Sequence, residues 1–231
     1  ASCFAVLGSQ SRGALLALVG MAFVLALKGK RPIQMSLLLG TLIVSAALFM
    51  PESWTARMET IKSYEADSSA MSRISTWKTL WNLALDRPLV GGGFGSDNAA
   101  VFAAYAPERV GDYVGGAVLV AHSIYFQALG EHGFPGLLLY LLLGFFTWKK
   151  AAEIAKKTEK DAELATWVPL LMRMVQVSLV GFAIGGAFLS LVYFDLPYYI
   201  IGYVVLVDAT LREREKSNLI SQPPKNKTIT V

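Results

Sequence analysis

The chain has 231 residues and a formal net charge of +4, with 54% hydrophobic and 16% charged residues. Soluble domains usually contain about 45–50% apolar and about 25% charged residues, so this composition favours a membrane protein. It excludes an intrinsically disordered chain, and the single cysteine, Cys3, excludes a disulfide scaffold. Because the first residue is Ala1, we expect the sequence to be a piece of a longer protein.

Five apolar stretches predict an all-α, polytopic membrane protein with about five transmembrane helices. The stretches are residues 13–27, 33–50, 134–148, 170–192 and 196–211. A crossing needs about 20 mostly apolar residues, so the first and third stretches must borrow flanking turns. We therefore expect a membrane-embedded unit over residues 1–211 and a polar, disordered tail over residues 212–231.

Basic residues follow the first, third and fifth stretches. These three clusters hold 13 of the 21 Lys and Arg residues, within residues 28–31, 149–160 and 212–227. With five spans, all three clusters fall on the same side of the membrane, and the positive-inside rule makes that side cytoplasmic. The basic excess is therefore a topology signal, and we expect no nucleic-acid partner.

The segment 51–121 is then external and too long for a simple connector. Residues 72–86 are expected to form an amphipathic helix at the membrane interface, ended by Pro88. Its expected apolar face is Ile74, Trp77, Trp81 and Ala84. The glycines that follow predict a turn or a close approach of the backbone to another segment: Gly91, Gly92, Gly93 and Gly95.

Two arginines on the external side are candidates for binding an anion. Arg12 stands at the start of the first apolar stretch, where a helix N-terminus attracts anions. Alternatively, Arg12 anchors that helix at the membrane interface. Arg73 lies in the first turn of the predicted 72–86 helix, where a cation opposes the helix dipole. This placement favours either an anionic ligand or pairing with Asp67 or Glu65.

His122 is a candidate general base. It lies beside a polar stripe of Ser123, Gln127 and Glu131, spaced four residues apart on one helical face, and a kink is expected at 133–136. The imidazole is the usual base near neutral pH, but a lone histidine is more often an interfacial hydrogen-bonding residue. With one cysteine and two histidines, the sequence predicts no metal site.

Three elements, in this order, resemble the O-antigen ligase and polymerase superfamily of bacterial membranes. They are Ser11-Arg12-Gly13 before a Leu/Ala-rich stretch, Arg73-Ile74-Ser75-Thr76-Trp77 continuing through the D-R-P-L-V-G-G-G-F-G run of residues 86–95, and His122-Ser123 through Gly130-Glu131-His132-Gly133-Phe134-Pro135-Gly136. The resemblance covers about residues 9–143 and extends to O-glycosylation ligases associated with exosortase systems. Since family members are usually longer, the chain resembles a C-terminal half.

The resemblance implies an inverting glycosyltransferase of the bacterial inner membrane that uses no metal or cofactor. A glycan on undecaprenyl pyrophosphate would pass to an acceptor in the periplasm, with residues 51–121 as a periplasmic loop. The acceptor is lipid A-core in ligases, a growing glycan in polymerases and a protein hydroxyl in protein O-glycosylation. Arg12 and Arg73 would bind the pyrophosphate, and His122 would take the proton of the acceptor hydroxyl.

Three other functions stay open from the sequence. A polymerase would use the same chemistry on a different acceptor. A transporter would need ionisable residues near the midplane of several spans. A non-catalytic membrane scaffold would not require Arg12, Arg73 and His122 to converge on one external pocket.

Overall fold

The structure is a computed structural model that describes residues 12–28, 34, 41, 68–106, 120–161 and 163–221. Within these ranges the chain forms helices and no strand, which confirms the expected all-α fold. The helices are α2 (Arg12–Lys28), α5 (Ser68–Asp86), α6 (Ala99–Tyr105), α7 (Ile124–Thr158), α8 (Val168–Gly186) and α9 (Asp195–Ser221). The expected apolar stretch at 33–50 lies outside the described residues, apart from Gln34 and Thr41.

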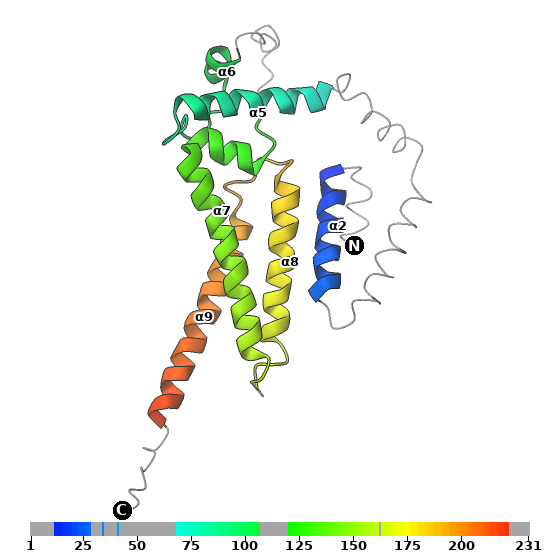
Figure 1. The fold of residues 1–231 in the computed structure, drawn as a ribbon, viewed down its shortest axis with the longest axis vertical. Helices are drawn as coiled ribbons and strands as arrows, with labels where there is room; N and C mark the ends of the chain where they lie inside the picture. The colour runs from blue at the N-terminus through cyan, green and yellow to red at the C-terminus, as the bar shows by residue number, and fades with distance from the viewer. Residues whose placement is uncertain are drawn as a thin grey trace, which may run out of the picture.

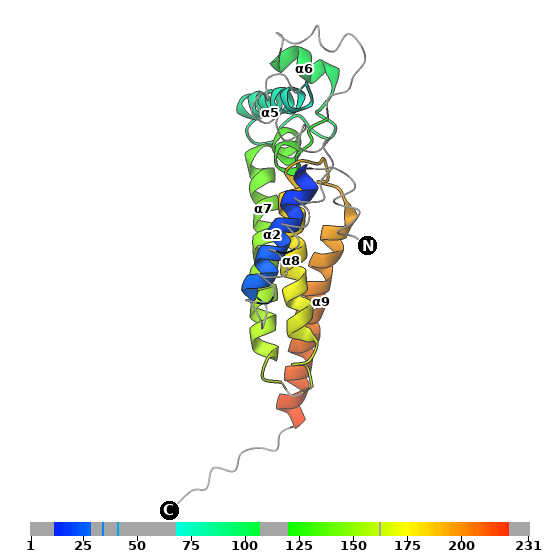
Figure 2. The same ribbon diagram turned by 90° about the vertical axis from the view of Figure 1, so that its right-hand side faces the viewer.

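Helices α2, α7, α8 and α9 form an elongated bundle, and α5 lies across one end of it (Figures 1 and 2). Helix α8 packs between α2 and α7, and α9 contacts both α7 and α8. Helix α5 contacts α7 and the short α6, and it runs crosswise to the bundle. The crosswise orientation is compatible with an amphipathic helix at a membrane surface, and the predicted interfacial position of this helix stays a prediction.

Two described helices, α7 and α8, are long and apolar enough to cross a membrane. Helix α2 contains the shorter apolar segment Gly13–Leu27, and the second half of α9 is rich in charged residues. The membrane-helix character is supported, whereas five crossings are not confirmed. Helix α8 also ends at Gly186, earlier than the expected residue 192, because residues 187–194 form turns between α8 and α9.

Small residues let α2 and α8 pack closely. A Cβ atom on Gly20 would lie 2.1 Å from Ile184 Cδ1, and one on Gly181 would lie 2.4 Å from Met21 Sδ. Both glycines therefore leave room for the ends of the Ile184 and Met21 side chains where the two helices touch. Interfaces built from small residues are typical of membrane helices, which associate by close packing rather than by expelling water.

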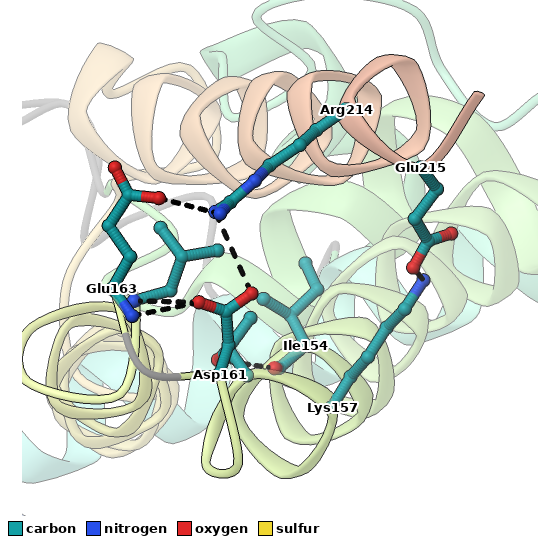
Figure 3. A network of polar contacts seen from close by, with 8 residues as sticks. Ile154, Lys157, Asp161, Glu163, Arg214 and Glu215 are labelled. Carbon is teal, nitrogen blue, oxygen red and sulfur yellow. Dashed lines mark hydrogen bonds and ion pairs between the residues drawn. The ribbon is translucent and has the colours of Figure 1, made fainter. Parts of the chain in front are cut away.

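Ion pairs join the end of α9 to the connection between α7 and α8 (Figure 3). Arg214 contacts Glu163 at 2.6 Å and Asp161 at 3.6 Å, and Lys157 contacts Glu215 at 2.5 Å. Two of the basic clusters therefore lie together at the end of the bundle opposite α5. The chain stays helical to Ser221, whereas we expected disorder from residue 212 onward.

The buried face of α5 differs from the predicted one. Leu80, Leu83 and Ala84 are fully buried, but Trp81 is 44% exposed and touches Phe134 edge-on. Polar positions can be buried on this helix because its threonine hydroxyls donate to its own backbone carbonyls; Thr79, for example, donates to the carbonyl four residues earlier at 2.9 Å. The predicted apolar stripe was therefore wrong at Trp81, whereas Ala84 is buried and Trp77 packs inward on Phe126.

A break in α7 lies at the position expected from the sequence. Gly133 has φ 68° and ψ −169°, and Pro135 follows it within the helix. Proline has no N–H, and the residues around Gly133 leave the helical path, so the carbonyl oxygens of Gly130 and Glu131 lose their acceptor role within the helix. An apolar environment offers no water to replace those bonds.

The glycine loop after α5 supplies the missing partners. The N–H groups of Gly92 and Gly93 donate to the two released carbonyl oxygens at 2.8 and 3.0 Å, and the N–H of Phe134 donates to the carbonyl of Pro88 at 2.9 Å. A Cβ atom on Gly91 would lie 2.5 Å from one of these carbonyl oxygens. The close backbone approach predicted for the glycine run is therefore confirmed, and its partner is the break in α7.

We predict that Gly133→Ala destabilises the protein by about 2–4 kcal/mol, because alanine is strained at positive φ and its Cβ would press on a backbone carbonyl. That carbonyl, of Pro88, lies 2.4 Å from the Cβ position. Gly144→Ala is the matched control in the same helix, since nothing lies within 4 Å of its Cβ position. Thermal unfolding of the purified protein in detergent checks this, and equal melting temperatures for the two variants would contradict the docking interface.

Candidate functional site

His122 immediately precedes α7 instead of lying on it. Its φ is 46°, and α7 begins at Ile124. We expected a helical position at the edge of the polar stripe, and this was wrong because a residue at positive φ cannot continue a right-handed helix. The histidine is therefore held on a short turn just before α7.

The residue before the histidine, Ala121, is completely buried and fixed from two directions. Trp77 of α5 donates its indole N–H to the carbonyl of Ala121 at 2.8 Å, and the indole stacks on Phe126 with ring centroids 5.1 Å apart. The Asp97 carboxylate accepts the N–H of Ala121 at 3.4 Å. Helix α5 and the loop before α6 thus place the turn that carries His122.

Arg73 lies on α5, one turn before Trp77. Because α5 begins at Ser68, Arg73 is in the second turn of the helix, and its predicted position in the first turn was wrong. Its Nε is buried and has no hydrogen-bond partner among the described residues. A buried donor without a partner is costly, and a guanidinium is suited to a bidentate bond with a phosphate or carboxylate. The alternative partners Asp67 and Glu65 lie outside the described residues. Arg73 therefore keeps a free donor in this part of the structure.

Arg73 and His122 lie close enough to interact electrostatically. Burial lowers the pKa of His122 below its ordinary value of 6.5, the positive charge of Arg73 lowers it further, and the Asp97 carboxylate opposes both effects. The imidazole is thus neutral at pH 7 and can accept a proton. The structure therefore brings together a cation, a neutral base and a carboxylate at the end of the bundle where α5 lies.

Arg12 is the first described residue of α2. The N-terminal end of α2 lies at the same end of the bundle as α5 (Figure 1). The next residue, Gly13, packs closely on Phe188, 3.0 Å from its Cβ position to the ring. The start of α2 is thus fixed against the segment that follows α8, and the role of the Arg12 side chain stays a prediction.

A second polar cluster lies farther along α7. Glu131 is 3% exposed, and its carboxylate accepts the N–H of Gly95 at 3.1 Å and the hydroxyl of Tyr193. The Tyr193 oxygen lies 2.7 Å from Nε2 of His132, which must carry the proton for this order of donation. Burial and the Glu131 hydrogen bond raise the pKa of Tyr193. His132 is therefore tied to the Tyr193–Glu131 pair, which leaves His122 as the better candidate base.

Three residues near the histidine turn and the polar stripe were not identified from the sequence: Asp97, Ser190 and Tyr193. Ser190 and Tyr193 lie in the turns after α8, and the apolar residues around them made residues 170–192 resemble one continuous span. Asp97 follows the glycine run, and only its charge in a loop could have marked it. Among the described residues, no three metal-ligating side chains come together.

We predict that the pKa of His122, measured by NMR on histidine-labelled protein, lies below 6.5. With two histidines in the chain, the signals can be assigned by substituting His132. Arg73→Gln should raise the pKa of His122 by removing a positive charge, and Asp97→Asn should lower it by removing a negative one. No response to Arg73→Gln would show that the two side chains are not neighbours.

A family model described as O-antigen ligase matches residues 1–141, which is more than half of the chain. This range includes Arg12, Arg73, the glycine loop, His122 and the break in α7. No curated protein and no solved structure matches the chain. The family match agrees with the resemblance seen in the three sequence elements: the chain belongs to the O-antigen ligase family.

Proposed function

We propose that the protein moves a glycan from undecaprenyl pyrophosphate to an acceptor hydroxyl on the periplasmic side of the bacterial inner membrane, as a ligase. Membership of the O-antigen ligase family supports glycosyl transfer between membrane-bound partners. The identity of the donor, the periplasmic side and the roles of individual residues go beyond what membership of the family shows. The acceptor is the hydroxyl of lipid A-core or of a protein.

The observation that carries the proposal is the proximity of Arg73 to a histidine with a lowered pKa. A pyrophosphate leaving group develops negative charge, and an arginine with a free donor can stabilise it without a metal ion. A hydroxyl nucleophile must lose a proton, and a neutral imidazole can take it. Arg73 would stabilise the leaving group and His122 would take the proton, and the charge of Arg73 helps to keep His122 neutral.

In the proposed reaction, the acceptor oxygen bonds to the anomeric carbon as the bond from that carbon to the pyrophosphate oxygen breaks. The hydroxyl proton passes to His122. The positive charges of Arg73 and Arg12 compensate the negative charge of the leaving pyrophosphate. Attack opposite the leaving group inverts the anomeric centre. We include Arg12 because the N-terminal end of α2 lies at the same end of the bundle as α5.

The distribution of basic residues supports the periplasmic placement. The clusters at the ends of α7 and α9 lie opposite the end that carries Arg73 and His122. The positive-inside rule assigns the basic end to the cytoplasm. The candidate site then faces the periplasm, the compartment in which the proposed transfer would take place.

The structure offers little support for a transporter. Asp208, an acidic residue within the expected fifth span, is paired with Arg212 at 2.8 Å and with Lys150 at 3.8 Å. Its charge is therefore compensated near the basic end instead of facing a substrate path. A polymerase would use the same residues with a growing glycan as acceptor, so the choice of acceptor in the following experiment separates the two.

The test measures transfer of labelled glycan from undecaprenyl pyrophosphate by the full chain in lipid nanodiscs, with lipid A-core, protein or free glycan as acceptor. His122→Asn should lower kcat by about 10²–10⁴-fold, because asparagine tolerates positive φ but cannot act as a base. Arg73→Lys should lose at least about tenfold, since a lysine cannot make the bidentate contact.

Matched controls use the other histidine and another arginine of the same region, His132→Gln and Arg87→Lys, which should stay near the wild-type rate. Full activity of His122→Asn would overturn the proposed base, and full activity of Arg73→Lys would overturn the pyrophosphate contact. Labelling of the free glycan alone would show a polymerase.

A further inference from the structure

His122 has a strained backbone conformation. Among the described residues it is the one non-glycine residue with positive φ, at 46°. This region is sparsely populated by residues with a Cβ, and such conformations persist only where the surroundings hold them. Specific contacts must therefore hold the histidine turn. The N–H group of His122 makes one of these contacts.

The N–H of His122 donates to the hydroxyl oxygen of Ser190 at 2.8 Å. Ser190 belongs to the turns between α8 and α9, 68 residues later in the chain. The two contacts on Ala121, from Trp77 and Asp97, fix the preceding residue. Trp77 and Ser190 thus hold the two sides of one peptide group, the carbonyl of Ala121 and the N–H of His122, and Ser190 is the contact that comes from the segment after α8.

The segment that carries Ser190 is itself anchored along α7. We call residues 187–194 the strap. Besides the Ser190 contact, Gln127 Oε1 accepts the N–H of Val192 at 3.4 Å, and Tyr193 donates to Glu131. From α9, Tyr198 donates to the carbonyl of Val192 at 2.5 Å. The strap therefore follows the polar stripe of α7 and is fixed on both sides of Val192.

We propose that Ser190 is a positioning residue for His122: its hydroxyl accepts the N–H of His122 and so helps to hold this residue in the left-handed conformation that sets the direction of its imidazole. This inference rests on the proposed role of His122 as the base. It also assigns a part in the site to the strap, which lies beyond residues 1–141 matched by the family model. The C-terminal part of the chain would then complete the geometry of the N-terminal part.

The test compares Ser190→Ala, which removes the acceptor, with Ser190→Thr, which keeps a hydroxyl. Misplacing a catalytic group by about 1 Å can cost about 100-fold in rate, so Ser190→Ala should lower kcat by roughly 10–100-fold while KM for the undecaprenyl pyrophosphate-linked donor stays unchanged. Ser190→Thr should restore most of the rate. Thr147→Val is the matched control, because it removes a buried hydroxyl of α7 far from the histidine turn.

Two further readouts separate positioning from a general loss of folding. The NMR signal of the His122 ring should change in Ser190→Ala, while the signal of His132 stays in place. In a His122→Asn background, Ser190→Ala should cause no further loss, since the residue that it positions is already absent. If Ser190→Ala caused a general folding defect, it would lower the residual rate of the His122→Asn variant as well.

Each outcome bears on one claim. Wild-type kcat for Ser190→Ala, with His122→Asn inactive, would overturn the positioning role and leave the proposed function standing. Wild-type kcat for His122→Asn would overturn the proposed function itself. A loss in Ser190→Ala that Ser190→Thr does not relieve, or a matching loss in Thr147→Val, would also refute the positioning role.

Discussion

The arrangement of the site depends on the docking of the glycine loop on the break in α7. The break releases two backbone carbonyls, of Gly130 and Glu131, and each unsatisfied group would cost several kcal/mol in an apolar environment. The N–H groups of Gly92 and Gly93 satisfy both. Since this loop continues directly from α5, the same contacts fix α5 across the end of the bundle (Figure 1).

Once α5 is fixed in this way, its N-terminal half lies over the start of α7. Trp77 can then hold Ala121, and Arg73 comes close enough to His122 to lower its pKa. The strap closes the arrangement from the opposite direction through Ser190. A backbone contact near one end of α5 thus determines the electrostatics of a histidine near its other end.

The sequence allowed the prediction of features that depend on local chemistry. Pro135 lacks an N–H and the glycines lack a Cβ, so the break in α7 and the close approach of the loop followed from residue types alone. The membership of the family followed from the motifs, whereas the external position that charge patterning predicts for Arg73 and His122 stays a prediction. The predicted functional roles of these residues stay predictions.

Features that depend on distant contacts could not be predicted. The strap is as apolar as the helix before it, so hydropathy did not show that α8 ends at Gly186. The exposed Trp81 and the buried Thr79 reverse the pattern that hydrophobicity predicts for α5, because the threonine hydroxyl is satisfied within the helix. The helical residues 212–221 make ion pairs with the end of α7 and with the connection between α7 and α8, contacts that the sequence could not show.

The central claim is that Arg73 and His122 form one binding site for a lipid pyrophosphate. The most direct measurement is the pKa of His122 by NMR, with and without undecaprenyl pyrophosphate, in samples whose lipid binding is verified separately. The account predicts that the bound lipid raises the pKa of His122, because the pyrophosphate compensates the positive charge of Arg73 and adds negative charge of its own. An unchanged pKa with the lipid bound would contradict the claim.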